Sequence, residues 1–150
     1  MYISFVTTTR DVPDALRLVC FELRGQEFGF PIMRVRETLI VQPITKVFLT
    51  SPALVGVFNL RGDIVPAIDL GVLLAIGPTA ITDSTRILLV KHDLGDVGIL
   101  VDRMLDQRSL EDLDPVPINL APAIASLLMG VATTATGTVR VLDCAAIIET

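Results

Sequence analysis

The sequence predicts an all-β protein with short helices, built as two small antiparallel barrels in tandem. Two observations support this fold class. Short runs of branched aliphatic residues alternate with turns that contain glycine, a pattern typical of short strands joined as hairpins. The composition agrees, because 51% of the 150 residues are hydrophobic and only 5% are aromatic. Aliphatic side chains of this kind fill the narrow interior of a small barrel.

The second observation is an internal repeat. Gly56 begins a strand that leads through a glycine turn into a second strand and then to Asp69, and Gly130 leads in the same way to Asp143. The two glycine-to-aspartate spacings are equal. The segments before the two glycines also correspond, with residues 28–30 matching residues 97–99. We therefore expect two halves, residues 15–77 and 84–150, which share an interface because each is too small to be stable alone. Exchange of terminal strands between the halves is compatible with this pattern.

In the first half, alternating apolar residues predict strands over 19–23 and 28–32 around a polar turn. Residues 33–40 fit a helical turn or a kinked strand. Ser51-Pro52 has the composition of a helix start, with serine as the N-cap and proline at the first helical position. Strands follow over 56–60 and 64–68, and Asp69 is expected to cap a helix over 70–76 that ends at Gly77-Pro78.

The second half repeats this order. Strands are predicted over 86–91, 97–101 and 104–110, followed by a proline-broken acidic loop over 111–122. A helix is expected over 123–129, and a final hairpin over 130–134 and 138–142. Asp143 is expected to cap a terminal helix over 144–149.

Charge and hydropathy exclude several classes of partner. The net charge is −5 and the pI is about 4.7, so a basic surface for nucleic acid or anionic lipid is not expected. The long uncharged stretch over 115–139 contains several prolines and glycines, which argues against a membrane span. No signal peptide is apparent, so we expect a soluble cytoplasmic protein with two buried free thiols, Cys20 and Cys144.

No motif for catalysis is present. The sequence has no phosphate-binding glycine loop, no serine nucleophile elbow and no zinc-protease motif. His92 is the only histidine, and we expect it to be exposed at a strand end rather than to act as a base. The acidic residues lack the spacing of a cation site. We therefore expect no enzyme activity, no cofactor and no metal.

The segment from Gly56 to Pro66 is the most distinctive. Pro66 lies inside a predicted strand, which indicates a sheet edge or a bulge because proline donates no backbone hydrogen bond. Arg61, beside Gly62, can be held against a carboxylate in a forked pair, and Glu37 is the candidate partner. Such a pair could stabilise the turn or take part in docking, and the residues alone leave both readings open.

These residues, taken in order, resemble the CheW domain of bacterial chemosensory systems. The resemblance covers about residues 18–148. It rests on Phe28-Gly29-Phe30-Pro31-Ile32, Val35-Arg36-Glu37, Gly56-Val57-Phe58-Asn59-Leu60-Arg61-Gly62, Ile64 to Leu70, Val97 to Asp102, Pro115-x-Pro117 and Gly130. Asn-Leu-Arg-Gly is the most specific piece.

The resemblance implies two SH3-like five-stranded barrels and a non-catalytic cytoplasmic adaptor. It implies two partners, the regulatory domain of a CheA-type histidine kinase and the cytoplasmic tip of a chemoreceptor, whose helix docks between the barrels. The positions that match the docking region are Val35, Glu37, Gly56, Asn59, Arg61, Gly62, Met104, Gln107 and Gly130.

Two alternatives stay open, and the first follows from departures from the family pattern, such as Gln107 where the family tends to be aliphatic. The first is a specialised paralogue that binds only the receptor or only the kinase and modulates array assembly. The second is a small-barrel ligand-binding module or enzyme, which would need convergent polar residues in a pocket.

Overall fold

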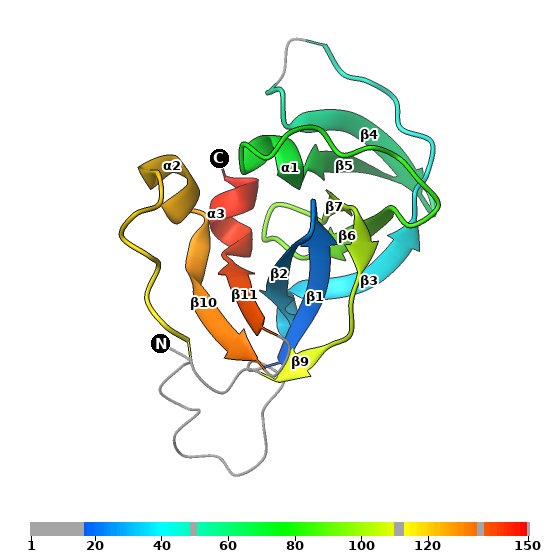
Figure 1. Ribbon diagram of the computed structural model, residues 1–150. Helices are drawn as coiled ribbons and strands as arrows, with labels where there is room; N and C mark the ends of the chain where they lie inside the picture. The colour runs from blue at the N-terminus through cyan, green and yellow to red at the C-terminus, as the bar shows by residue number, and fades with distance from the viewer. Residues whose placement is uncertain (1–16, 49–50, 110–112, 135–136, 150) are drawn as a thin grey trace.

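The computed structural model describes residues 17–48, 51–109, 113–134 and 137–149, and it contains two sheets with short helices (Figure 1). The first sheet has the order β10-β11-β2-β1-β8, with β9 also pairing with β1. Its strands are β1 (Arg17–Leu23), β2 (Gln26–Pro31), β8 (Arg103–Met104), β9 (Arg108–Ser109), β10 (Leu128–Thr134) and β11 (Gly137–Leu142). We call it sheet A.

The second sheet, sheet B, has the order β3-β6-β7-β5-β4. Its strands are β3 (Val35–Ile40), β4 (Leu54–Leu60), β5 (Asp63–Asp69), β6 (Arg86–Val90) and β7 (Val97–Val101). The predicted mostly-β class is therefore confirmed. Most pairs are antiparallel as expected, but each sheet also contains one parallel pair, β2 with β11 and β5 with β7.

Strand pairing crosses between the two halves of the chain. The opening hairpin, β1–β2, joins sheet A with the closing hairpin, β10–β11, which comes from the far end of the sequence (Figure 1). The hairpin β6–β7 joins sheet B with β3, β4 and β5. The ranges 15–77 and 84–150 thus describe the sequence repeat, whereas each sheet takes strands from both ranges.

The exchanged hairpins are buried on both faces, and this explains their nearly continuous apolar sequence. In β1, Leu18 and Cys20 pack in the interior cluster of sheet A, whereas Val19 and Phe21 pack in the largest cluster. That cluster also contains Leu88 and other residues of β6 and β7, so it joins the two sheets. Strands buried on both faces are expected to lack strict alternation.

Each sheet is closed by one isolated bridge. Thr45, after β3, bridges to Val57 of β4, and Asp114, after β9, bridges to Val131 of β10. A glycine precedes the bridged residue in each strand, and its missing side chain lets the partner backbone approach closely. A Cβ on Gly56 would lie 2.1 Å from the Thr45 carbonyl oxygen, and one on Gly130 would lie 2.4 Å from that of Asp114. The repeated glycines of the sequence therefore lie at the two closure points.

The repeated aspartates cap helices, as the sequence predicted. The Asp69 carboxylate accepts the backbone N–H of Gly71 at 3.0 Å and begins α1 (Leu70–Leu73). Asp143 accepts the N–H of Ala146 at 3.2 Å and begins α3 (Cys144–Ile148). Asp69 is buried, and Thr79 donates two further hydrogen bonds to it. An aspartate N-cap satisfies the unpaired amides of a first helical turn.

Several local expectations differ from the structure. Ser51-Pro52 begins a turn rather than a helix, with the Leu54 N–H donating to the Ser51 carbonyl at 3.0 Å. The predicted helices over 70–76 and 123–129 are replaced by the shorter α1 and α2 (Pro122–Ala125). In place of the single strand predicted over 104–110, the described residues form β8, which ends at Met104, and β9 (Arg108–Ser109), and residue 110 lies outside them. Residues 32–34 form a 3₁₀ turn, η3 (Ile32–Arg34), before β3.

Pro66 is not on an edge strand, because β5 lies between β4 and β7. The pairing of β5 with β7 starts at Ala67, so the missing N–H of proline falls just before that ladder begins. The bulge at this level is in β4, between Leu54 and Gly56.

We predict that Gly130→Ala destabilises the protein by about 2 kcal/mol, because overpacking against a fixed backbone carbonyl costs this much. Gly29→Ala, in the same sheet, is the matched control, since its Cβ would meet neighbouring side chains at an ordinary 3.4 Å. Urea unfolding of both variants measures the difference. Equal stability of the two variants would contradict the closure role of Gly130.

Candidate protein-docking groove

A groove lies where β3 of sheet B meets β1 and the β8–β9 segment of sheet A. Its volume is about 410 Å³. Nine residues from both sheets and from η3 line it: Val19, Ile32, Val35, Arg36, Glu37, Thr38, Met104, Leu105 and Gln107. The sequence repeat alone did not place this groove, because its two walls come from strands far apart in the chain.

Four of the expected site residues meet in this groove. Val35 and Glu37 lie on β3, with Met104 on β8 and Gln107 just before β9. Val35 and Met104 are half-buried and pack against the cluster that joins the sheets. Methionine is flexible and polarizable, so Met104 gives the floor an adaptable apolar surface.

Arg61 and Glu37 form the forked pair that the sequence suggested. Arg61 Nη1 and Nη2 donate to the two carboxylate oxygens of Glu37 at 2.9 and 2.8 Å. These hydrogen bonds hold the pKa of Glu37 below its usual value of 4.5. The Arg61 side chain is 67% exposed, so the pair is a surface feature with a small effect on stability.

The turn that carries Arg61 is a two-residue hairpin loop. Arg61 and Gly62 have φ of 52° and 93°, the conformation of a primed β-turn. Asn59 Oδ1 accepts the Gly62 N–H at 3.0 Å and stabilises this loop. Asn59 and Gly62 therefore position Arg61, and neither of them lines the groove.

Gly56 and Gly130, the other expected site residues, lie at the closure points of the two sheets rather than in the groove lining. Thr38, Leu105, Val19 and Ile32 line the groove and were not singled out from the sequence. The sequence carried no signal for them, because residues 35–40 read Val-Arg-Glu-Thr-Leu-Ile and do not alternate apolar with polar side chains.

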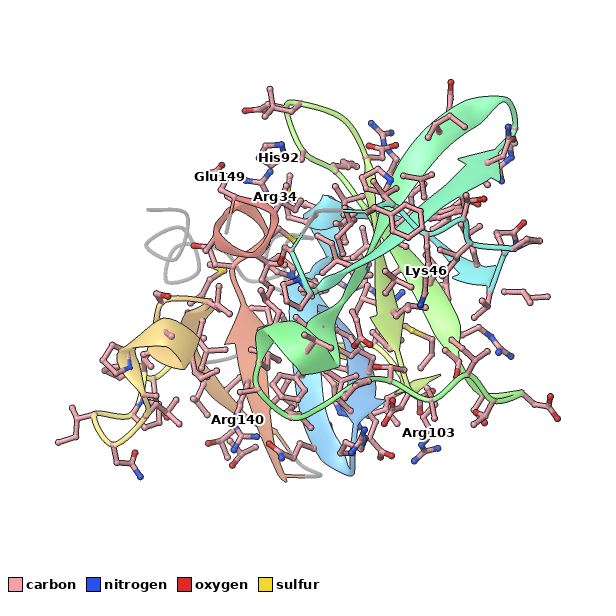
Figure 2. All side chains as sticks on the ribbon, turned by 90° about the horizontal axis from the view of Figure 1, so that it is seen from above. Arg34, Lys46, His92, Arg103, Arg140 and Glu149 are labelled. Atoms are coloured by element: carbon pink, nitrogen blue, oxygen red, sulfur yellow. The ribbon has the colours of Figure 1, made fainter. Side chains whose placement is uncertain are left out.

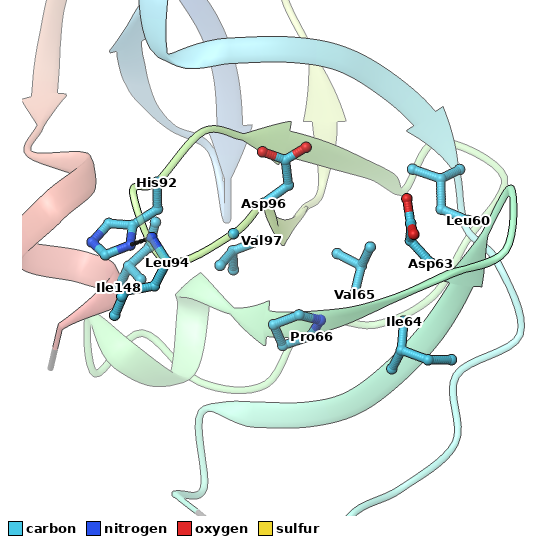
Figure 3. A pocket seen from close by; sticks show the side chains of 11 residues that line it. Leu60, Asp63, Ile64, Val65, Pro66, His92, Leu94, Asp96, Val97 and Ile148 are labelled. Carbon is cyan, nitrogen blue, oxygen red and sulfur yellow. Dashed lines mark hydrogen bonds between the residues drawn. The ribbon is translucent and has the colours of Figure 1, made fainter.

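A separate hollow of about 550 Å³ lies between β5 and the β6–β7 turn (Figure 3). It contains Asp63, Asp96 and His92, the residue types of acid–base chemistry. Asp96 is paired with Arg36 at 2.8 Å, however, and His92 Nδ1 accepts the Leu94 N–H at 3.1 Å while Nε2 contacts Glu149. Both ring nitrogens of His92 thus have partners already.

The expectation of an exposed His92 was wrong. Its side chain is only 8% exposed, because the contacts with Glu149 after α3 and with the Leu94 amide hold the ring against the protein. This hydrogen-bonded position gives His92 a structural role at the junction of the β6–β7 turn with α3.

Cys20 and Cys144 are buried free thiols, as expected. Burial raises the pKa of Cys20 to about 11 and that of Cys144 to about 12, so neither thiolate forms near neutral pH.

Among the described residues, no group of three or more histidine, cysteine or carboxylate side chains could hold a metal ion. No helix within these same ranges is long and apolar enough to cross a membrane.

We predict that Arg61→Ala raises the pKa of Glu37 toward its usual value, because the hydrogen bonds to the carboxylate are lost. NMR titration of the Glu37 side chain measures this, and Arg103→Ala, which removes the pair with Glu22, is the control. Because the pKa of Glu37 is lower in the folded than in the unfolded protein, the pair stabilises the fold at pH values above the pKa that Glu37 has in the unfolded chain. This stabilisation is lost as pH falls through the folded pKa. An unchanged Glu37 pKa in Arg61→Ala would contradict the pairing.

Comparison with known proteins places this fold in a family. A model described as the CheW-like domain matches residues 17–150. The chemotaxis protein CheW of Helicobacter pylori is 33% identical over 115 residues, which cover 74% of this chain and 68% of that protein. The chemotaxis protein CheW of Bacillus subtilis is 32% identical, over 65% of this chain and 63% of its own length.

A solved structure shows the same fold. The scaffolding protein TtCheW from Thermoanaerobacter tengcongensis superposes with a TM-score of 0.80 at 25% sequence identity, covering 91% of this chain and 89% of that one. The agreement extends over both sheets, since nearly all of the described residues are covered. The chain belongs to the CheW-like domain family.

Proposed function

We propose that this protein is a non-catalytic scaffold that couples chemoreceptors to a CheA-type histidine kinase in a chemosensory pathway. The observation that carries the proposal is the groove between the sheets, which brings Val35, Glu37, Met104 and Gln107 together. Membership of the CheW-like family supports it, because relatives in that family are named chemotaxis proteins.

The groove has the chemistry of a helix-docking surface. Its floor is apolar, with half-buried Val35, Met104 and Leu105. Its rim is polar, with Glu37 fixed by Arg61 and with exposed Gln107. An amphipathic helix inserts its apolar face into a groove of this kind, and polar contacts at the rim set its register. We assign the cytoplasmic tip of a chemoreceptor to this groove.

The kinase regulatory domain is the second partner, and it must bind outside the groove if both partners bind together. We propose that the scaffold works in the cytoplasm, at membrane-associated receptor arrays. The docking residues proposed here are Val35, Glu37, Thr38, Arg61, Met104 and Gln107. Gly56, Asn59, Gly62 and Gly130 support them through closure and turn geometry.

Size-exclusion chromatography of the full chain with each partner tests this function. Elution together with both the kinase regulatory region and a receptor tip fragment is the expected result. Elution with only one of them would replace coupling by the role of a specialised paralogue. Elution with neither at micromolar concentration would reject the proposal.

We predict that Thr38→Arg abolishes receptor-tip binding at micromolar concentration and leaves kinase binding unchanged. Thr38 is exposed and lines the groove, so the larger charged side chain occupies the space for the helix without disturbing the core. Thr138→Arg is the matched control, because Thr138 is exposed on β11 and outside the groove lining. Normal receptor binding by Thr38→Arg would place the receptor elsewhere.

A further inference from the structure

A second cavity lies at the junction of the two sheets, and its lining shares no residue with the groove. Its volume is about 490 Å³. The end of β2, η3, the residue after β6, β10 and the start of α3 surround it. Its lining residues are Pro31, Met33, Arg34, Lys91, Met129, Asp143 and Cys144.

Two cations lie together in this lining. The backbone N–H of Lys91 donates to the carbonyl of Arg34 at 2.8 Å, which fixes the two residues side by side. None of the ion pairs found in the described part of the chain uses either side chain. The pairs use Arg36, Arg61, His92, Arg103 and Arg108 instead. Arg34 and Lys91 thus place two positive charges next to each other in a protein of net charge −5.

One carboxylate, Asp143, lines the same cavity as these cations. Its Oδ1 accepts the Ala146 N–H as the cap of α3. A second carboxylate, Glu149 at the end of α3, contacts His92, which is the residue after Lys91. Figure 2 shows Arg34, His92 and Glu149 close together in this part of the molecule. The lining thus holds two cations and one carboxylate, and this excess of positive charge attracts a carboxylate from another molecule.

Apart from Asp143, the rest of the lining is apolar. Pro31 and Met129 contribute to the wall, and Met33 is 57% exposed. A free inorganic anion would leave this apolar surface uncovered. A flexible methionine beside two cations suits a polypeptide that presents a carboxylate next to an aliphatic or aromatic side chain. The cavity volume falls within the range of about 300–1,000 Å³ typical of ligand pockets.

We propose that Arg34, Lys91 and Met33 form a docking site for a short acidic and apolar segment of a partner protein. The segment binds by carboxylate contacts to Arg34 and Lys91 and by packing of one apolar side chain on Met33 and Met129. This site is separate from the groove, so its existence does not rest on the proposed coupling function.

Titration of the full-length chain with a blocked peptide of alternating glutamate and leucine, followed by NMR of the backbone amides, tests this site. The expected result is a set of shifts confined to Met33, Lys91, Met129, Cys144 and their neighbours. The glutamine–leucine version of the peptide is expected to bind about tenfold more weakly or not at all. No localised shift up to millimolar peptide, or equal binding of the neutral peptide, would overturn the proposal.

Charge reversal identifies the residues responsible. Arg34→Glu and Lys91→Glu are each expected to weaken peptide binding about tenfold. Lys46→Glu makes the same change in net charge at an exposed residue that lines a different hollow, and it is expected to have an effect of about twofold or less. Thr38→Arg is expected to leave peptide binding unchanged. Equal weakening by Lys46→Glu would show a non-specific charge effect and would contradict the site.

Discussion

The exchange of hairpins between the two sheets is the constraint on which the rest of the structure depends. Hairpin β1–β2 closes against β10–β11, and hairpin β6–β7 closes against β4–β5 and β3. Both exchanged hairpins bury one face inside their own barrel and the other face in the cluster between the barrels. The two barrels therefore cannot separate without exposing this shared core, whose burial is worth about 25 cal/mol per Å² of apolar surface.

This constraint fixes the groove and explains its usefulness for docking. Val35 and Glu37 follow directly from η3, which connects a strand of sheet A to a strand of sheet B. Met104 of β8 pairs with Phe21 on β1, so the opposite wall is attached to the exchanged hairpin. A groove whose walls are both built on a shared core is preorganised, and less of the binding free energy is lost to ordering its residues.

Much of the fold could be predicted from the sequence because its signals are local. The strands follow from aliphatic runs and turns, and Asp69 and Asp143 cap helices as their spacing suggested. The repeated glycines were recognised, but their physical cause, close approach to Thr45 and Asp114, depends on contacts along the folded chain. The hairpin exchange could not be deduced, since two similar repeats satisfy the same apolar pattern whether they pair within or between halves.

The candidate site was predicted in part for the same reason. The Arg61–Glu37 pair could be proposed because Arg61 lies beside Gly62 in a predicted turn and Glu37 lies in a charged segment. The structure contains this pair. The burial of His92 was missed because it depends on Glu149, which lies beyond the final hairpin of the chain. The proximity of Arg34 and Lys91 could not be predicted from the sequence, because it follows from the hydrogen bond between η3 and the residue after β6.

Native-state hydrogen exchange of the β1–β2 and β6–β7 amides, followed as denaturant is raised, tests the central claim most directly. If the exchanged hairpins bind the barrels into one unit, the most protected amides of both hairpins open with the same free energy and the same denaturant dependence. If one hairpin opens at clearly lower free energy while the other sheet stays protected, the barrels are separate units and the shared-core account is contradicted.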